Sequence, residues 1–132
     1  MTKLDHIGIA VKSINAAKTI YEDLGLHVEH VETVDTQKVR TAFLSVGDAN
    51  LELLEPSAPD STIAKYIEKR GEGIHHICFR VDDIEAELAR LKERGYRLIN
   101  EAPVPGAHGC RVAFLHPAAG NGVLIELSEK TP

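Results

Sequence analysis

The sequence has no tryptophan, and aromatic residues make up only 5% of its 132 residues. Its two cysteines, Cys78 and Cys110, stand apart without C-x-x-C spacing, so we expect a reducing, cytoplasmic setting. No apolar run approaches about 18 residues, which excludes a membrane-spanning helix, and the N-terminus lacks the anatomy of a signal peptide. The net charge of −5 argues against nucleic acid as the main partner.

What remains is the composition of an ordinary soluble globular protein, with 43% hydrophobic and 27% charged residues. The most informative feature is an imperfect tandem repeat, because a shift of 70 to 74 positions aligns much of the first half with the second. The aligned pairs are His6 with His76, Val11 with Val81, Ile14 with Ile84, Gly25 with Gly95, residues 42–44 with 113–115, and 51–53 with 125–127. We therefore predict two copies of one module within a single domain.

Each half reads as βαβββ. In the first half, strands are predicted at about 4–11, 27–33, 39–46 and 50–55, with a helix capped by Ser13 and ended by Gly25. In the second half they are predicted at about 74–81, 97–100, 111–115 and 123–128, with a helix after Asp83, while 101–109 reads as a loop. The first helix is expected to pack on the core through its apolar stripe of Ile14, Ala17, Ile20, Tyr21 and Leu24.

The expected fold class is α+β, with the two βαβββ modules forming a curved mixed sheet around a metal-binding cleft. The first module spans about 1–56, a linker helix capped by Asp60 or Ser61 lies within about 57–72, and the second module spans about 73–132. One helix cannot cover both faces of four strands, so the modules should pair and leave a concave surface.

Four residues recur in register across the repeat. His6 and His76 each open a first strand on the side opposite its aliphatic residues, and Glu52 and Glu126 each lie between two aliphatics of a last strand. Two imidazoles and two carboxylates related by repeat suit a divalent metal with positions left open for substrate.

Two plainer interpretations compete with a metal site. A single histidine at a strand start is more often a surface residue than a ligand, and outward charges on edge strands are routine. His75 is the rival of His76, but strand alternation turns His75 to the other side and it has no histidine counterpart in the first half. Cys78 shares the side of His76, where a small buried thiol that fills space is the expected role.

These residues resemble the vicinal oxygen chelate superfamily and, within it, the methylmalonyl-CoA epimerase family. The similarity covers nearly the whole chain, and its more specific parts are the ELLEP and DSTIAK stretches and the AFLHP and NGVLIEL stretches. The segments that carry it are 4–11, 52–56, 60–65, 73–77, 113–117 and 122–127.

The resemblance implies a divalent metal, cobalt or manganese first and nickel, zinc or magnesium as alternatives, held by His6, His76 and Glu126 with Glu52 as fourth ligand. In several family members that fourth position is a glutamine. It also implies an acyl-CoA substrate, a place in propionate metabolism, a homodimer, and interconversion of (2R)- and (2S)-methylmalonyl-CoA through a metal-stabilised enolate.

Inversion at C2 is simplest with two bases. Glu126 is the first candidate. Some family members carry the second base as a glutamate two positions before the aromatic residue of the third strand, where this sequence has Thr41. A threonine cannot serve as that base, so Glu52, a water, a substrate group or a neighbouring position in the strand must take the role.

Three other functions fit parts of the pattern. A glyoxalase-type isomerase would use the same four ligands and enolate chemistry on a glutathione hemithioacetal. Ring-cleaving dioxygenases use two histidines and one glutamate on iron(II), but usually need further repeats. A metal-free binding module of the same fold would need an aromatic-lined cleft, which the scarcity of aromatic residues does not favour.

Overall fold

The computed structural model describes residues 2–131. Its residues cluster into two compact units. The N-terminal unit is His6–His75, and the C-terminal unit consists of the residues before His6 together with those from His76 onward. No helix among the described residues is long and apolar enough to cross a membrane.

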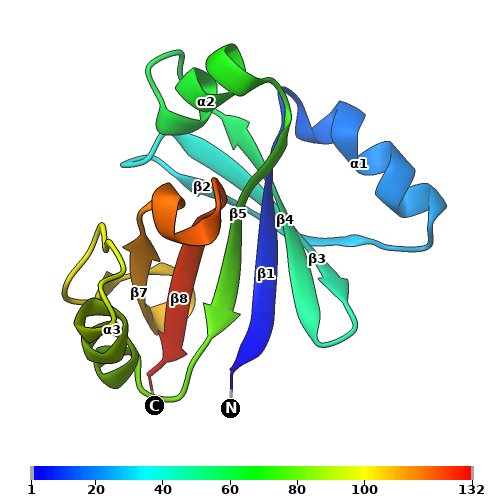
Figure 1. Cartoon of the computed structure of the whole chain (residues 1–132). Helices are drawn as coiled ribbons and strands as arrows, with labels where there is room; N and C mark the ends of the chain where they lie inside the picture. Colours follow the sequence, from blue (N-terminus) through cyan, green and yellow to red (C-terminus); the bar gives the residue numbers. More distant parts are fainter. Residues whose placement is uncertain (1, 132) are drawn as a thin grey trace. The chain divides into compact units, whose positions relative to one another are not determined.

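The sheet of the N-terminal unit has the strand order β2-β3-β4-β1 (Figure 1). β1 runs parallel to β4, whereas β4, β3 and β2 are joined as antiparallel neighbours. The elements are β1 (Lys3–Ala10, whose first three residues belong to the C-terminal unit), α1 (Ile14–Asp23), β2 (Val28–Val34), β3 (Val39–Val46), β4 (Ala49–Pro56) and α2 (Thr62–Arg70).

The sheet of the C-terminal unit repeats this plan with the order β5-β8-β7-β6, and β5 runs parallel to β8. The predicted βαβββ pattern is therefore confirmed in both halves. The elements are β5 (Gly73–Arg80, whose first three residues belong to the N-terminal unit), α3 (Ile84–Glu93), β6 (Val104–Pro105), β7 (Cys110–Leu115), β8 (Leu124–Lys130) and the 3₁₀ turns η1 (Ala107–Gly109) and η2 (Pro117–Gly120).

One strand of the second half was predicted in the wrong place. Residues 97–100 form no strand, and the stretch predicted as a loop contributes β6 at the edge of β7 instead. The reason is local: the N–H groups of Ile99 and Asn100 both donate to the carbonyl of Phe114, and the Asn100 side chain accepts from the Phe114 N–H. These bonds use up the groups that a regular ladder would need, so only an isolated bridge between Leu98 and Leu115 remains.

In each unit one face of the sheet packs against a helix, and most of the buried residues involved are related by the repeat. The cluster under α1 contains Val11, Ile14, Ala42, Leu44 and Leu53, all buried. The cluster under α3 contains the repeat counterparts of four of these residues, Val81, Ile84, Ala113 and Leu127, together with Leu88 of the helix itself. α2 covers part of the opposite face of the N-terminal sheet through Ile63, which packs with Ala10, Val39 and Leu54.

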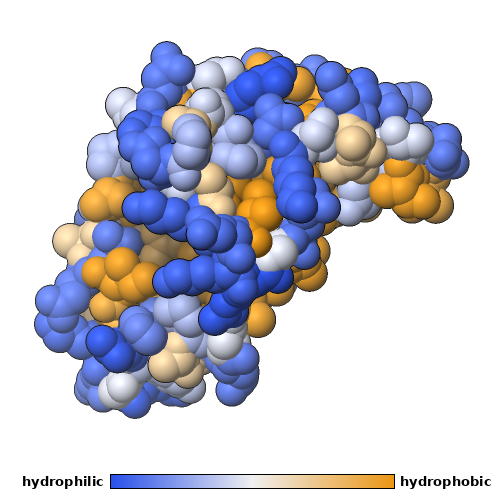
Figure 2. Space-filling model, turned by 90° about the horizontal axis from the view of Figure 1, so that it is seen from above, coloured by the Kyte–Doolittle hydropathy of each residue, from blue (hydrophilic) through white to orange (hydrophobic). Residues whose placement is uncertain are grey.

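The apolar stripe predicted for α1 is only partly buried. Ile14 lies in the core and Ala17 and Tyr21 pack against it, but Ile20 is 58% exposed and Leu24 is 70% exposed. Figure 2 shows the resulting hydrophobic surface at the end of α1. The prediction that all five residues face the core was wrong, because the stripe is wider than the surface that the sheet offers to this helix.

The first turn of α1 and that of α3 are each held by two side chains, a local N-cap and a carboxylate from a strand distant in the sequence. The predicted caps Ser13, Ser61 and Asp83 are confirmed, since each side chain accepts a backbone N–H of the first turn. In addition, Glu55 accepts the Ile14 N–H at 2.9 Å and Glu129 accepts the Ile84 N–H at 2.8 Å.

An arginine completes each of these caps. Arg40 lies 3.1 Å from Glu55, and Arg111 lies 2.8 Å from Glu129. Arg111 and the Ile84 N–H hold the pKa of the Glu129 carboxyl below its usual range, while Glu129 and Glu85 raise the pKa of Arg111. The repeat thus includes a helix cap that joins the last strand of each module to its helix.

Replacing Glu129 by glutamine should destabilise the fold in a pH-dependent way. A lowered folded-state pKa means that ionised Glu129 stabilises the fold at neutral pH, and that this contribution is lost as the pH falls through the acid range. Glu129→Gln should therefore lower the Tm by a few degrees at pH 7, and the deficit should shrink below about pH 4. Thermal denaturation followed by circular dichroism at several pH values measures this.

The matched control is Glu93→Gln, which alters an exposed carboxylate at the end of α3 and should change the Tm little at any pH. A Tm deficit of Glu129→Gln that stays constant from pH 7 to pH 3 would show that the charge of the cap does not contribute.

Candidate metal-binding and proton-transfer site

The N-terminal unit places His6 and Glu52 side by side. His6 lies on β1 opposite Asn50, and Glu52 lies on β4 opposite Gly8, so the two are diagonal neighbours on adjacent parallel strands. The Nδ1 atom of His6 is 3.1 Å from a carboxylate oxygen of Glu52. The two side chains are only 10% and 16% exposed, respectively.

The C-terminal unit contains an equivalent pair. His76 lies on β5 opposite Leu124, and Glu126 lies on β8 opposite Cys78, which repeats the register of the first pair. The Nε2 atom of His76 is 3.4 Å from a carboxylate oxygen of Glu126, and both side chains are almost fully buried.

The position of the two glutamates rules out the interpretation as edge-strand charges. β4 and β8 are interior strands of their sheets, each with a neighbour on both sides. A carboxylate at such a position loses its hydration, which costs free energy unless a donor or a cation compensates it. In each unit the histidine is one such partner.

Aromatic rings border both pairs. Phe43 on β3 lies opposite Glu52, and Phe114 on β7 lies opposite Glu126. The Phe114 ring meets the His76 ring edge-on, with a centroid separation of 6.4 Å. Apolar walls of this kind exclude water from one side of a polar cluster and so strengthen its electrostatic interactions.

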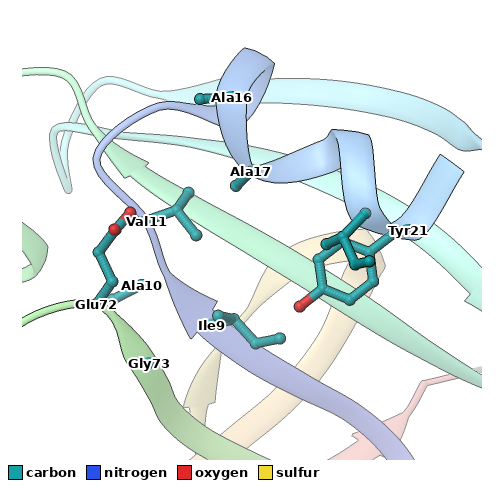
Figure 3. A pocket seen from close by; sticks show the side chains of 9 residues that line it. Ile9, Ala10, Val11, Ala16, Ala17, Tyr21, Glu72 and Gly73 are labelled. Carbon is teal, nitrogen blue, oxygen red and sulfur yellow. The ribbon is translucent and has the colours of Figure 1, made fainter. Parts of the chain in front are cut away.

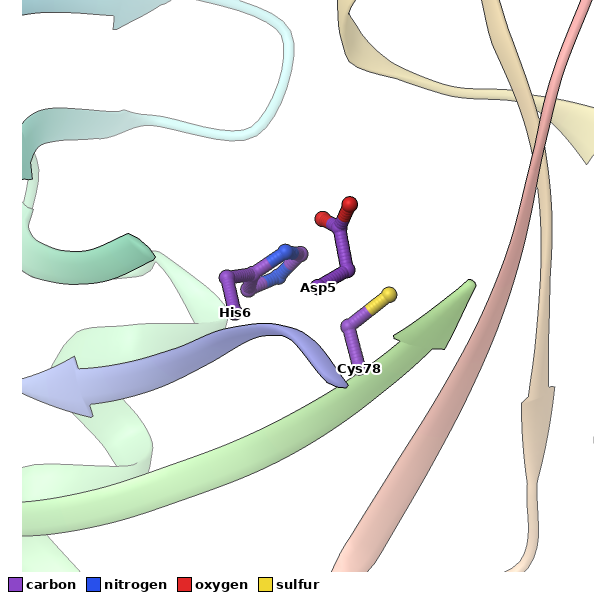
Figure 4. Close-up of side chains that lie close together, drawn as sticks. All are labelled: Asp5, His6 and Cys78. Carbon is purple, nitrogen blue, oxygen red and sulfur yellow. The ribbon is translucent and has the colours of Figure 1, made fainter. Parts of the chain in front are cut away.

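The two units differ at the residue next to each glutamate. Gly8, which is buried, occupies this position in β1, whereas Cys78 occupies it in β5. Cys78 is 0% exposed, which agrees with the predicted role of a thiol that fills space. Figure 4 shows the Cys78 sulfur near the carboxylate of Asp5, the residue before His6 on β1, with the ligand atoms of Asp5 and Cys78 within 4.8 Å. Asp5 is itself paired with Arg80 at 2.6 Å.

Thr41 lies on the same side of β3 as Phe43. It is buried, and its neighbours across the strands are Leu54 on β4 and Glu32 on β2. His30 on β2 stacks on Phe43 with a centroid separation of 5.6 Å. His30 has no counterpart in the repeat, so the signal that singled out His6 and His76 could not identify it.

A separate pocket of about 360 Å³ opens on the other face of β1 (Figure 3). Ile9 and Val11 form its floor, and Ala16, Ala17 and Tyr21 of α1 form one wall. Its one carboxylate, Glu72, accepts the N–H of Lys12 at 2.8 Å. The pocket is thus an apolar groove that the small alanines leave open, without the donors of a metal site.

The burial of the two thiols predicts how they react. Cys78 is inaccessible whereas Cys110 is partly exposed, so a thiol reagent should modify one cysteine in the folded protein and both after unfolding. Counting the modified thiols by mass spectrometry measures this. Cys110→Ser should leave no reactive thiol in the folded state, and rapid modification of that variant would contradict the burial of Cys78.

Known proteins are similar to this chain over nearly its whole length. The profile of the Glyoxalase/Bleomycin resistance protein/Dioxygenase superfamily matches residues 5–114. The chain is 41% identical over 130 residues to the ethylmalonyl-CoA/methylmalonyl-CoA epimerase of Cereibacter sphaeroides, which covers 96% of this chain and 97% of that protein.

Two solved structures are also similar. A hypothetical protein of Bacillus halodurans C-125 superposes with a TM-score of 0.94 at 50% identity, covering 99% of this chain and 96% of that one. A methylmalonyl-CoA epimerase in complex with methylmalonyl-CoA and NH4+ superposes with a TM-score of 0.87 at 38% identity, covering 99% and 96%. These comparisons confirm the family and the fold class inferred from the sequence, and the expectation of an enzyme of the isomerase class.

Proposed function

The chain belongs to the Glyoxalase/Bleomycin resistance protein/Dioxygenase superfamily, and we propose that it is an epimerase that interconverts (2R)- and (2S)-methylmalonyl-CoA. The observation that carries the proposal is the duplicated His–Glu pair, which joins two adjacent parallel strands in each unit and is at most 16% exposed. Similarity over nearly the full length to a named epimerase, and to an epimerase structure that contains this substrate, supports the same conclusion.

The donor set fits a divalent metal. Two imidazole nitrogens and two carboxylate oxygens are the ligands that borderline and hard divalent ions prefer, and each carboxylate is at most 16% exposed, so a cation would offset the cost of its charge. We propose that His6, Glu52, His76 and Glu126 together bind one such ion, with cobalt or manganese as the first candidates. A divalent ion held there supplies a Lewis acid that stabilises negative charge on the thioester oxygen.

The residues themselves perform the proton transfer. The proton on C2 of methylmalonyl-CoA lies between a thioester and a carboxylate, so its removal produces an enolate. We assign the removal to the Glu126 carboxylate, which is confined by its contact with His76 and by the Phe114 ring. Glu52, which lies beside the His6 imidazole, is assigned to the ligand set alone.

Metal-dependent exchange at C2 is the first expected outcome. Protein stripped of metal and then resupplied with cobalt should incorporate deuterium from D₂O at C2 of methylmalonyl-CoA and epimerise it, and the stripped protein should do neither. NMR and chiral analysis of the product measure both. If the metal-loaded protein produced no exchange, the epimerase assignment would fail. Turnover of the hemithioacetal of methylglyoxal and glutathione would then indicate a glyoxalase-type isomerase.

Removing the proposed base should lower the rate without unfolding the protein. Glu126→Gln should reduce kcat by about 10²-fold or more, the usual contribution of a general base. The matched control is Glu129→Gln, the same change on the same strand, where the side chain turns to the opposite side and caps α3. An equal loss of activity in both variants would indicate a general effect on β8 rather than the loss of a base.

Native mass spectrometry tests the ligand set and the expected homodimer in one measurement. The unmodified chain should carry one divalent ion per subunit, and His6→Ala and His76→Ala should each lose it. His108→Ala, at an exposed histidine in η1, should keep the metal. Retention of metal by both strand variants would contradict the proposed ligands, and a monomer at micromolar concentration would contradict the homodimer.

A further inference from the structure

Inversion at C2 requires a proton to leave from one face of the substrate and another to arrive on the opposite face. This inference rests on the proposed function, in which Glu126 of the C-terminal unit serves one face. The other face then needs a second group that can carry a proton near neutral pH. The N-terminal unit is where that group must be sought, because its sheet carries the other half of the ligand set, His6 and Glu52.

Strand alternation defines the side of the N-terminal sheet that carries His6 and Glu52, called here the site face. Directly opposed residues of neighbouring strands point to the same side. Glu52 is opposed by Phe43 on β3, and Phe43 is opposed by His30 on β2. In the next row, Thr41 of β3 is opposed by Glu32 of β2. Glu32 therefore lies on the site face.

The carboxylates of Glu52 and Glu29 on this face are engaged. Glu52 contacts His6, and the Glu29 carboxylate accepts the Ser45 hydroxyl at 2.8 Å. The His30 ring is stacked on Phe43. Glu32 is half-buried, and its carboxylate has no hydrogen bond or ion pair to any other residue between 2 and 131. It is thus the carboxylate of this face that is available for a substrate.

Thr41 leaves room for Glu32 to reach the site. Thr41 and Glu52 are diagonal neighbours on β3 and β4, a separation of about 7–8 Å, and Glu32 lies about 5 Å from Thr41 on the far side. The Thr41 side chain is short, so it takes up little of the distance between Glu32 and Glu52. A glutamate that leans over it extends toward Glu52.

We propose that Glu32 is the second proton-transfer group of the epimerase. In one direction the Glu126 carboxylate takes the C2 proton, and the electrons of the broken C–H bond pass into the enolate. The carboxylic acid form of Glu32 then gives its proton to C2 on the other face, which forms the new C–H bond and leaves Glu32 ionised. In the reverse direction the two residues exchange roles, and each returns to its starting protonation state through solvent.

Separating exchange from inversion tests this assignment. Glu32→Gln should lower epimerisation by about 10²-fold or more, whereas deuterium exchange at C2 of one stereoisomer, with retention of configuration, should persist because Glu126 can remove a proton and return a deuteron. The matched control Glu29→Gln, on the same strand, should leave both rates unchanged. Thr41→Glu in the Glu32→Gln background moves a carboxylate one strand closer and should restore inversion.

The opposite results overturn the inference. Full epimerase activity in Glu32→Gln would exclude Glu32 as the second proton-transfer group. Loss of inversion in His30→Asn, with Glu32→Gln unaffected, would exclude it as well. Equal loss of exchange from both stereoisomers in Glu32→Gln would show a general defect rather than a missing second base. Absence of exchange in the unmodified, metal-loaded protein would instead contradict the proposed function, and this inference with it.

Discussion

The whole arrangement depends on the alternation of side chains along two pairs of parallel strands, β1 with β4 and β5 with β8. In each pair the odd-numbered side chains of the later strand, such as Leu53 and Leu127, enter the core beneath a helix. The even-numbered ones then face the other way, and Glu52 and Glu126 are among them. A shift of one residue in either register would bury a carboxylate in the core and expose a leucine, so packing of the helix side fixes the histidine and glutamate on the site side.

The helix caps reinforce this register. Glu55 and Glu129 lie three residues after Glu52 and Glu126, so they point to the helix side and reach the first turns of α1 and α3. A carboxylate at a helix N-terminus is favoured by the unpaired N–H groups and the helix dipole, and the arginine from the neighbouring strand adds a second partner. The same short strand thus supplies a site glutamate on one side and a structural glutamate on the other, at a fixed spacing.

Much of the fold and of the candidate site was predictable, because the two halves of the sequence repeat each other and residues that recur in register can be recognised. The hydrophobic cores, the caps Ser13 and Asp83 and most strands followed from the periodicity of the hydrophobic residues and from the turn residues. The displaced strand near Asn100 did not, because a side-chain hydrogen bond to the backbone decides it and leaves no hydrophobic pattern. The Glu55 and Glu129 caps also join residues 41 and 45 positions apart, beyond any local signal. The cross-strand position of Glu32 required the observed pairing of β2, including its bulge after Val28.

The two halves share most of their core residues and both have a His–Glu pair. They differ in the outer rows of the faces that carry these pairs. Thr41 and Glu32 face each other across two strands of the N-terminal sheet, and the corresponding pair in the C-terminal sheet is Val112 and Val104. A duplicated module starts with two identical site faces, but the proposed epimerisation needs a ligand set from both modules and different proton-transfer groups for the two faces of the substrate carbon. Retaining both His–Glu pairs while changing the outer rows satisfies both demands. The polar residues at 32 and 41, set against two valines, are thus where we expect the function to have broken the symmetry of the fold.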